Sequence, residues 1–214
     1  MDNELKKHVL KTGTTTIGIV TKEGIVLAAD KQGSYGDSHG GVHYIAGEME
    51  KIKAFNDNIL LTISGTATFA LRAIKQLQAE IRLKELKDKK KATMKEIANL
   101  FSIMALQSLH SGGAIGFIMA GKENGEAKLY EISPDGILKD IDTYKISGSG
   151  MMHVNSILDT EYKKGLNLEE GIQLVKRCIK GSAGRDPATG IGYEIWTITP
   201  DKLEKVENKL WELD

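Results

Sequence analysis

The pattern of apolar and polar residues changes its period several times along the chain, and the first segments have the pattern of β-strands. β-branched and apolar residues dominate residues 14–20 and 25–29, and the polar segment between them ends in Gly24, as in a β-hairpin. Residues 51–55 and 59–63 form a second such pair around Asn-Asp-Asn, whose side chains hydrogen-bond local backbone and favour a turn. The start of the chain therefore predicts two β-hairpins.

Helical spacing replaces this pattern after Gly65. Apolar residues recur on one face of residues 70–81, with charged residues elsewhere, which predicts an amphipathic helix. A second helix is predicted to begin after Thr93, because Thr93 and Glu96 have the spacing of a capping box, and to continue to residue 109. The lysine-rich residues 87–91 are expected to form the loop between these helices.

Strand patterns return in the second half of the chain. Residues 114–120 and 128–132 lie on either side of an Asn-Gly turn, and residues 143–146 predict a further short strand. Two more strands are expected at 193–198 and 203–206, where β-branched and apolar residues dominate again. The second half therefore contains two groups of strands, separated by a helical region.

That helical region predicts two further helices, over residues 152–164 and 168–181. The second is preceded by Asn167, with Glu170 at capping distance. The order of elements is thus strands, two helices, strands, two helices, strands. This order favours an α+β fold with two antiparallel sheets between helical layers.

Composition limits the classes of function. The chain has 214 residues, 41% of them hydrophobic, which predicts one compact domain. Basic and acidic residues balance at 29 each, so net charge gives no reason to expect a nucleic acid or an anionic membrane as partner. No apolar stretch reaches the ~18 residues of a membrane span, and residues 1–13 lack the apolar core of a signal peptide.

The cysteine content points to a location inside the cell. Cys178 is the only cysteine, so neither an intrachain disulfide nor a multi-cysteine metal site can form. Its place in a predicted helix indicates a packing role. We expect a reducing, cytoplasmic location.

Thr14 is the candidate nucleophile. A threonine hydroxyl is weak alone, but a free α-amino group on the same residue, with a pKa of about 7.7–8.0, can accept its proton. Cleavage of the Gly13–Thr14 bond would create that amine, and glycine leaves the carbonyl open to attack by the Thr14 hydroxyl. Without further support, a run of three threonines is more often only the start of a strand.

Further support comes from residues 14–31, which read T-T-T-I-G-I-V-T-K-E-G-I-V-L-A-A-D-K. This segment closely resembles the start of the mature archaeal-type proteasome beta subunit, a threonine protease of the N-terminal nucleophile hydrolase superfamily. The resemblance covers nearly everything after Gly13 and implies a four-layer αββα sandwich. It implies a propeptide, residues 1–13, removed by self-cleavage, and one catalytic domain, residues 14–214. The expected activity is hydrolysis of unfolded proteins through an acyl-enzyme ester on Thr14.

The resemblance also assigns partners to the nucleophile. Asp30 and Lys51 match the aspartate and lysine that serve the threonine in that family; without the surrounding motif they would be a strand-end aspartate and a surface lysine. A lysine beside Thr14 would lower the pKa of the neighbouring amine and hydroxyl through its positive field. Gly65, in I-S-G-T-A, matches the glycine whose backbone N–H donates to the oxyanion.

Two later motifs extend the match. G-S-G at residues 148–150 implies that Ser149 lies beside the catalytic amine. R-D-P-A-T-G at residues 185–190 matches the family's R-D-x-x-S-G and carries over Asp186. Thr189 stands where the family usually has serine; its hydroxyl can still donate and accept, but its methyl group needs room.

Six further residues are matched by position to the substrate-binding region around the family's first specificity pocket. They are Gly33, Ser34, Met49, Ile63, Ala67 and Leu71. All are apolar or small, so the resemblance implies cleavage after hydrophobic residues.

The loop expected between Asp30 and Lys51 is several residues longer than is usual in the family, which leaves specificity and assembly open. It contains His39 and His43, but without a cysteine or a third ligand nearby these predict a solvated loop rather than a metal site. The proposed chemistry needs no metal and no other cofactor, because hydroxyl, amine and oxyanion donor all come from the chain.

The resemblance implies an assembly of seven-membered homo-oligomeric rings, with alpha-subunit rings and an ATPase regulator as partners. Three alternatives remain. A non-catalytic or unprocessed ring subunit is disfavoured by the intact Thr14, Asp30 and Lys51. A subunit of a two-ring bacterial-type ATP-dependent peptidase is disfavoured by the R-D-x-x-T-G segment. A small-molecule amidase of the same superfamily would fail to degrade an unfolded protein.

Overall fold

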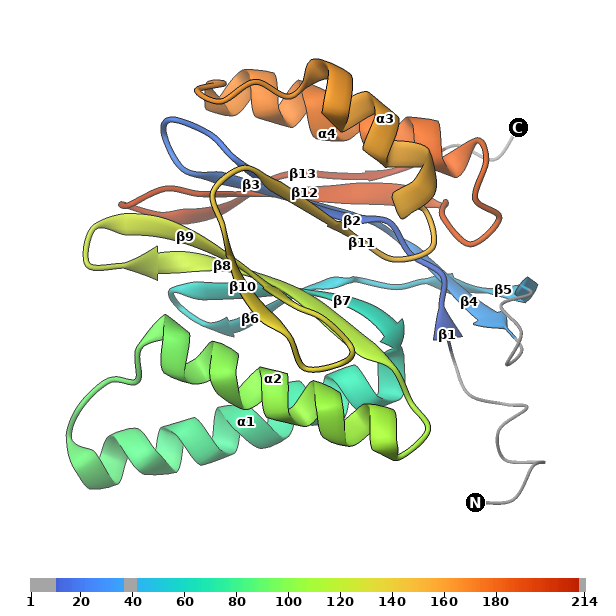
Figure 1. Cartoon of the computed structure of the whole chain (residues 1–214). Helices are drawn as coiled ribbons and strands as arrows, with labels where there is room; N and C mark the ends of the chain where they lie inside the picture. The colour runs from blue at the N-terminus through green and yellow to red at the C-terminus, as the bar shows by residue number, and fades with distance from the viewer. Residues whose placement is uncertain (1–10, 37–41, 212–214) are drawn as a thin grey trace.

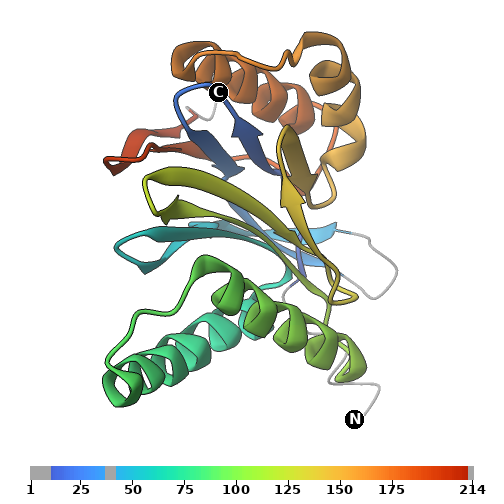
Figure 2. The same ribbon diagram turned by 60° about the vertical axis from the view of Figure 1, so that its left-hand side comes forward.

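The computed structural model describes residues 11–36 and 42–211. Two views of the chain show four layers, in which a helical pair, a sheet, a second sheet and a second helical pair follow one another (Figures 1 and 2). The predicted α+β class and the four-layer αββα sandwich are therefore confirmed.

The first sheet has the strand order β1-β7-β8-β9-β10, and β6 also pairs with β7. Its strands are β1 (Lys11–Thr12), β6 (Ile52–Asn56), β7 (Ile59–Thr66), β8 (Ile115–Glu123), β9 (Glu126–Ile132) and β10 (Leu138–Ile141). All pairings are antiparallel. The central strands β7 and β8 are the two predicted from the apolar segments at residues 59–63 and 114–120.

The second sheet has the order β11-β2-β3-β12-β13 and is also antiparallel. Its strands are β2 (Thr16–Val20), β3 (Ile25–Asp30), β11 (Tyr144–Ser147), β12 (Gly192–Ile198) and β13 (Leu203–Leu210). The chain thus brings its start, its middle and its end into one sheet. Thr14 lies two residues before β2, which pairs with β11 and with the central strand β3.

The helices cover the outer faces of the two sheets (Figure 1). They are α1 (Ala67–Asp88) and α2 (Met94–His110) on the first sheet, and α3 (Met151–Glu161) and α4 (Leu168–Ala183) on the second. The capping boxes predicted at Thr93 with Glu96 and at Asn167 with Glu170 are both present. These caps satisfy backbone N–H groups of the first turn and fix where each helix begins.

Apolar residues fill all three spaces between the layers. Alternation along β3 turns Val26 and Ala28 toward α3 and α4 and Leu27 toward the other sheet. On the opposite side, the ring of Phe101 in α2 lies 5.5 Å from the ring of Phe55 and 4.9 Å from that of Phe117. The contacts of Phe101 hold α2 on the first sheet.

The segment between Asp30 and Lys51 differs from the expectation of a solvated loop. Its described part forms an antiparallel pair of strands, β4 (Gln32–Gly36) and β5 (Val42–Glu48). His39 lies outside the described residues, and His43 belongs to β5. For residues 32–36 and 42–48 the prediction of a loop is wrong, because backbone pairing rather than an apolar pattern holds these glycine-containing and polar residues.

Some boundaries also differ. Helix α1 continues to Asp88, so the predicted loop at residues 87–91 begins later, where Lys89 takes a left-handed conformation with φ 52°. Helix α3 ends at Glu161 rather than at residue 164, because Tyr162 is extended and packs its ring against Tyr144. The short strands β1 and β10 were not predicted.

The described residues contain neither a cluster suited to a metal ion nor a helix suited to a membrane. No set of three or more His, Cys, Asp or Glu side chains among them is placed to hold a metal ion. In the same part of the chain, none of the helices has the length and apolar character needed to cross a membrane.

Cys178 is buried in α4 against the second sheet, and burial raises the pKa of its thiol to about 12.

We predict that Phe101→Ala lowers the free energy of unfolding by about 3–5 kcal/mol, because it leaves a cavity between two other aromatic rings. Ile103→Ala on the same helix is the control; its side chain is 53% exposed, so a change within about 0.5 kcal/mol is expected. Denaturant unfolding measures both. Equal losses for the two variants would contradict the packing described here.

Candidate active site

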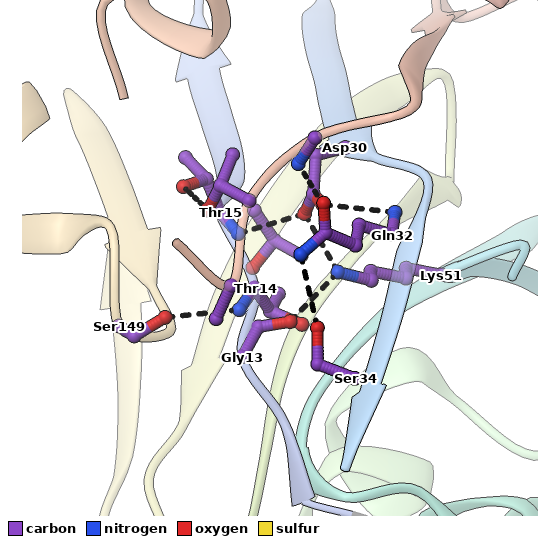
Figure 3. A network of polar contacts seen from close by, with 12 residues as sticks. Gly13, Thr14, Thr15, Asp30, Gln32, Ser34, Lys51 and Ser149 are labelled. Carbon is purple, nitrogen blue, oxygen red and sulfur yellow. Dashed lines mark hydrogen bonds and ion pairs between the residues drawn. The ribbon is translucent and has the colours of Figure 1, made fainter. Parts of the chain in front are cut away.

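Thr14 lies between β1 and β2, at the point where the chain passes from the first sheet to the second. The residue is fully buried, and its Oγ1 makes no hydrogen bond with any other described residue. Its backbone N–H donates to Ser149 Oγ at 3.1 Å (Figure 3). A buried hydroxyl without a partner is costly, so an unpaired Oγ1 at this position points to a chemical rather than a structural role.

Lys51 reaches this point from the opposite side in Figure 3. It precedes β6, and its side chain is fully buried. Its Nζ donates to Asp30 Oδ1 at 2.7 Å and to the carbonyl oxygen of Gly13 at 2.9 Å. The lysine therefore contacts both its carboxylate partner and the carbonyl group of the bond predicted to be cut.

Asp30, the last residue of β3, is held by several donors. Its Oδ1 also accepts the N–H of Thr15 at 2.9 Å, and its Oδ2 accepts the N–H groups of Gln32 at 3.0 Å and Gly190 at 3.1 Å. These bonds satisfy a carboxylate that has no access to water. They also fix its orientation toward Lys51.

The electrostatics of this pair are dominated by burial. Loss of solvent lowers the pKa of the Lys51 ammonium, while the charges of Asp30 and Asp186 oppose that shift. Loss of solvent likewise raises the pKa of the Asp30 carboxyl, against the effect of Lys51 and of the backbone donors of Thr15 and Gln32. Burial thus works against both charges of the pair, while their mutual attraction and hydrogen bond favour them.

A second network approaches Thr14 from the side of Ser149. Ser149 Oγ donates to Asp186 Oδ2 at 2.6 Å, and Thr189 Oγ1 donates to the same oxygen at 2.6 Å. Thr189 Oγ1 also lies 2.8 Å from Thr15 Oγ1. Thr189 is buried and its hydroxyl makes two hydrogen bonds, so the site accommodates its extra methyl group.

The glycines of the G-S-G motif let this network come close to Thr14. Gly148 has φ +102°, and a Cβ there would lie 2.0 Å from the carbonyl oxygen of Thr14. A Cβ on Gly150 would lie 1.9 Å from Thr15 Oγ1, and the N–H of Gly150 donates to the Thr14 carbonyl at 3.2 Å. Only glycine fits on both sides of Ser149.

Gly65 lies in β7 with φ +90°, where a Cβ would approach the carbonyl oxygen of Ala114 to 2.1 Å. It pairs in register with Thr12 of β1, and Lys11 pairs with Thr66. The residues just before the bond predicted to be cut therefore lie along the strand that carries Gly65. Its role as an oxyanion donor stays a prediction.

The residues matched to the specificity pocket are distributed over β4, the segment between β5 and β6, β7 and α1. A Cβ on Gly33 would lie 3.4 Å from that of Met49, and Met49, Ile63 and Leu71 belong to one apolar cluster. Ala67, the first residue of α1, is buried. Ser34 is also buried, and its Oγ accepts a hydrogen bond from Gln32 Nε2 at 3.1 Å.

Four buried polar residues around the site were not identified from the sequence. They are Thr15, Gln32, Ser182 and Glu194. Thr15 Oγ1 lies 2.6 Å from Ser182 Oγ, and Gln32 Nε2 donates to Pro187 O at 2.7 Å. Of these four, Glu194 is the residue that the sequence marks most clearly, because a charged residue stands inside an otherwise largely apolar strand.

The sequence of this chain is similar to the sequences of known proteins. The family described as "Proteasome subunit" matches residues 10–198. The chain is 34% identical to "Proteasome subunit beta" of Nanoarchaeum equitans, over 90% of this chain and 96% of that protein. It is 33% identical to "Proteasome subunit beta 1" of Thermococcus kodakarensis, over 88% and 90% of the two chains.

The chain belongs to the proteasome subunit family. The expected resemblance to archaeal-type proteasome beta subunits is thereby confirmed, as a third similar protein, "Proteasome subunit beta" of Methanopyrus kandleri, also indicates at 32% identity over 90% of each chain. In this member of the family, Lys51 contacts the carbonyl before Thr14 and Ser149 contacts the Thr14 nitrogen. This arrangement calls for a chemical explanation.

We predict that Lys51→Met lowers the free energy of unfolding by about 3–5 kcal/mol, because it leaves the buried Asp30 carboxylate without its cation. The double variant Asp30→Asn/Lys51→Met removes both charges. Its cost should fall short of the sum of the single costs by about 1–3 kcal/mol. Denaturant unfolding of Asp30→Asn, Lys51→Met and the double variant measures this coupling.

Lys164→Met serves as the control for a lysine pair, because Lys164 and Asp142 are 78% and 83% exposed and such pairs contribute little. Strictly additive costs for Asp30 and Lys51 would contradict a direct interaction between the two side chains.

Proposed function

We propose that this chain is a threonine endopeptidase subunit of a proteasome core particle and that it matures by cutting its own Gly13–Thr14 bond. The observation that carries the proposal is the surroundings of Thr14. Its hydroxyl is buried without a partner, while Lys51 contacts the carbonyl before it and Ser149 contacts its nitrogen.

In the proposed maturation step, Thr14 Oγ1 attacks the carbonyl carbon of Gly13 as its hydroxyl proton is removed. The negative charge that develops on the Gly13 oxygen would be stabilised by Lys51 Nζ, which lies 2.9 Å away. The C–N bond then breaks, the Thr14 nitrogen receives the proton, and an ester to Gly13 remains. Water hydrolyses that ester, which releases residues 1–13 with a C-terminal carboxylate and frees the threonine hydroxyl.

After that cut, the same groups would serve turnover. The new amine of Thr14 lies beside Ser149, whose hydroxyl donates to Asp186 and so leaves an oxygen lone pair facing the amine. The amine can accept the hydroxyl proton when Oγ1 attacks a peptide carbonyl, and Lys51 supplies a positive field. The acyl-enzyme ester is then hydrolysed by water, with the same amine as base and the N–H of Gly65 as the proposed oxyanion donor.

The pairing of β1 with β7 supports binding of the substrate as an extended strand. Residues 11–12 occupy an edge of β7 and also contact β4, so an extended peptide could occupy the same place once they leave. The small and apolar residues Gly33, Met49 and Ile63 nearby favour hydrophobic side chains before the cut bond. Unfolded polypeptides are the substrates that can supply an extended strand.

The relatives named above suggest the assembly. We propose homo-oligomeric rings of seven subunits, with alpha-subunit rings and an ATPase as partners, in the cytoplasm. The single buried Cys178 is compatible with a reducing compartment. Native mass of the purified particle would test the ring size directly.

We predict that Thr14→Ala retains residues 1–13 and slows peptide hydrolysis by at least about a thousandfold, because it removes the attacking oxygen. Thr14→Ser keeps that oxygen and should still mature and hydrolyse peptides. Intact mass and the hydrolysis of a fluorogenic peptide with a hydrophobic residue before the cut are the two measurements. Activity in Thr14→Ala, or in wild-type protein that still carries residues 1–13, would refute the mechanism.

A further prediction concerns Gly13, where a Cβ would lie 1.7 Å from the Cβ of Ala188. Gly13→Ala should displace the carbonyl from Lys51 and slow maturation by at least about tenfold. The double variant Gly13→Ala/Ala188→Gly removes the closest contact and should recover much of the rate. A time course of intact mass measures both; no recovery in the double variant would show that Ala188 is not the cause.

A further inference from the structure

Glu194 is a fully buried carboxylate in β12, and it contacts the backbone of Lys51. Its Oε1 accepts the N–H of Lys51 at 3.1 Å and the N–H of Ile52 at 3.0 Å. A charged residue in the interior is retained only where hydrogen bonds or an ion pair compensate its loss of water. Here the compensation comes from the segment that carries the lysine of the proposed active site.

The other carboxylate oxygen faces away from this segment. Glu194 Oε2 accepts the indole N–H of Trp196 at 3.3 Å and lies 3.5 Å from Nζ of Lys205. Lys205 also lies over the Trp196 ring, 5.1 Å from its centroid, and is partly exposed. The two oxygens therefore have separate partners, and the contacts of one can be changed without removing those of the other.

The contacts of Lys51 show why Glu194 matters for geometry. Its N–H bonds to Glu194, its C=O accepts the N–H of Ile63 at 2.8 Å, and its Nζ bonds to Asp30. Asp30 and Glu194 lie on the paired strands β3 and β12 of the second sheet, whereas Lys51 leads into β6 of the first. The lysine is thus held at its backbone and at its tip by carboxylates of the opposite sheet.

We propose that Glu194 is a positioning residue for Lys51, and that it sets the distance of Lys51 Nζ from Asp30 and from the reacting carbonyl. The inference rests on the proposed function and adds a residue to it. Glu194 touches neither Thr14 nor the bond to be cut, so it acts only through the backbone of residues 51 and 52. A displacement of about 1 Å at a catalytic group can reduce a rate by about a hundredfold.

The test uses the assembled protein in a Trp196→Phe background. Trp196→Phe removes the indole N–H from Oε2 and leaves the bonds of Oε1 in place, so it should mature and hydrolyse peptide at nearly the unsubstituted rate. In that background, Glu194→Gln keeps an acceptor oxygen at full reach, and its amide nitrogen no longer faces the indole donor. Lys205, the other group near Oε2, is partly exposed and can turn its ammonium group to solvent. Glu194→Asp keeps the charge but shortens the side chain, and Glu194→Leu removes both acceptors.

The expected order of kcat, and of the rate at which residues 1–13 are lost, is Gln above Asp above Leu. We expect Gln to stay within about threefold of its background and Leu to fall by at least about tenfold, with KM within about twofold throughout. A role in stability alone would lower the melting temperature without this order in the kcat of the folded protein. If Glu194→Leu does not fold, the comparison of Gln with Asp still decides.

Two results would overturn the inference: an Asp variant more active than the Gln variant, which would assign the effect to charge, or a folded Leu variant with unchanged kcat. Failure of the proposed function looks different. In that case the unsubstituted protein would itself keep residues 1–13 and hydrolyse no peptide, whatever stands at position 194.

Discussion

The buried ion pair of Asp30 and Lys51 is the interaction on which the arrangement of the site depends. Neither side chain is exposed to solvent, and their 2.7 Å contact joins the end of β3 to the start of β6. Two buried charges stabilise a protein only if geometry and further hydrogen bonds offset their loss of water. The surrounding backbone supplies those bonds to Asp30, so the positions of neighbouring segments follow from the need to satisfy this pair.

The four-layer architecture brings distant parts of the chain to that pair. Thr14, Asp30, Lys51, Ser149 and Asp186 come from five separate segments that end or begin at one edge of the two sheets. Asp30 is the last residue of β3, and the other four lie between elements, where backbone N–H groups are not all used in strand or helix pairing. The apolar clusters between the layers keep the sheets at a fixed separation, and the polar contacts at their edge are made within that separation.

Much of this could be predicted from the sequence, for identifiable reasons. Helices α2 and α4 have clear apolar periodicity and capping boxes, so their starts at Met94 and Leu168 follow from local residues alone. Strand β1 has only two residues and exists through its pairing with β7, and β4 and β5 lack a clear alternating pattern. The roles of Gln32 and Glu194 depend on which strands lie side by side, which local sequence does not encode.

The pairing of β1 with β7 has a consequence for the timing of activity. While residues 11–12 are part of the same chain as Thr14, they occupy the edge of β7 as an intramolecular ligand, whose effective concentration for short connections is of millimolar order. A separate peptide that binds at the same edge must compete against this effective concentration of residues 11–12. In the proposed maturation, cutting the Gly13–Thr14 bond would turn the occupant into a separate molecule that is diluted as it leaves. One covalent event would then change both the chemistry of Thr14 and the competition for its site.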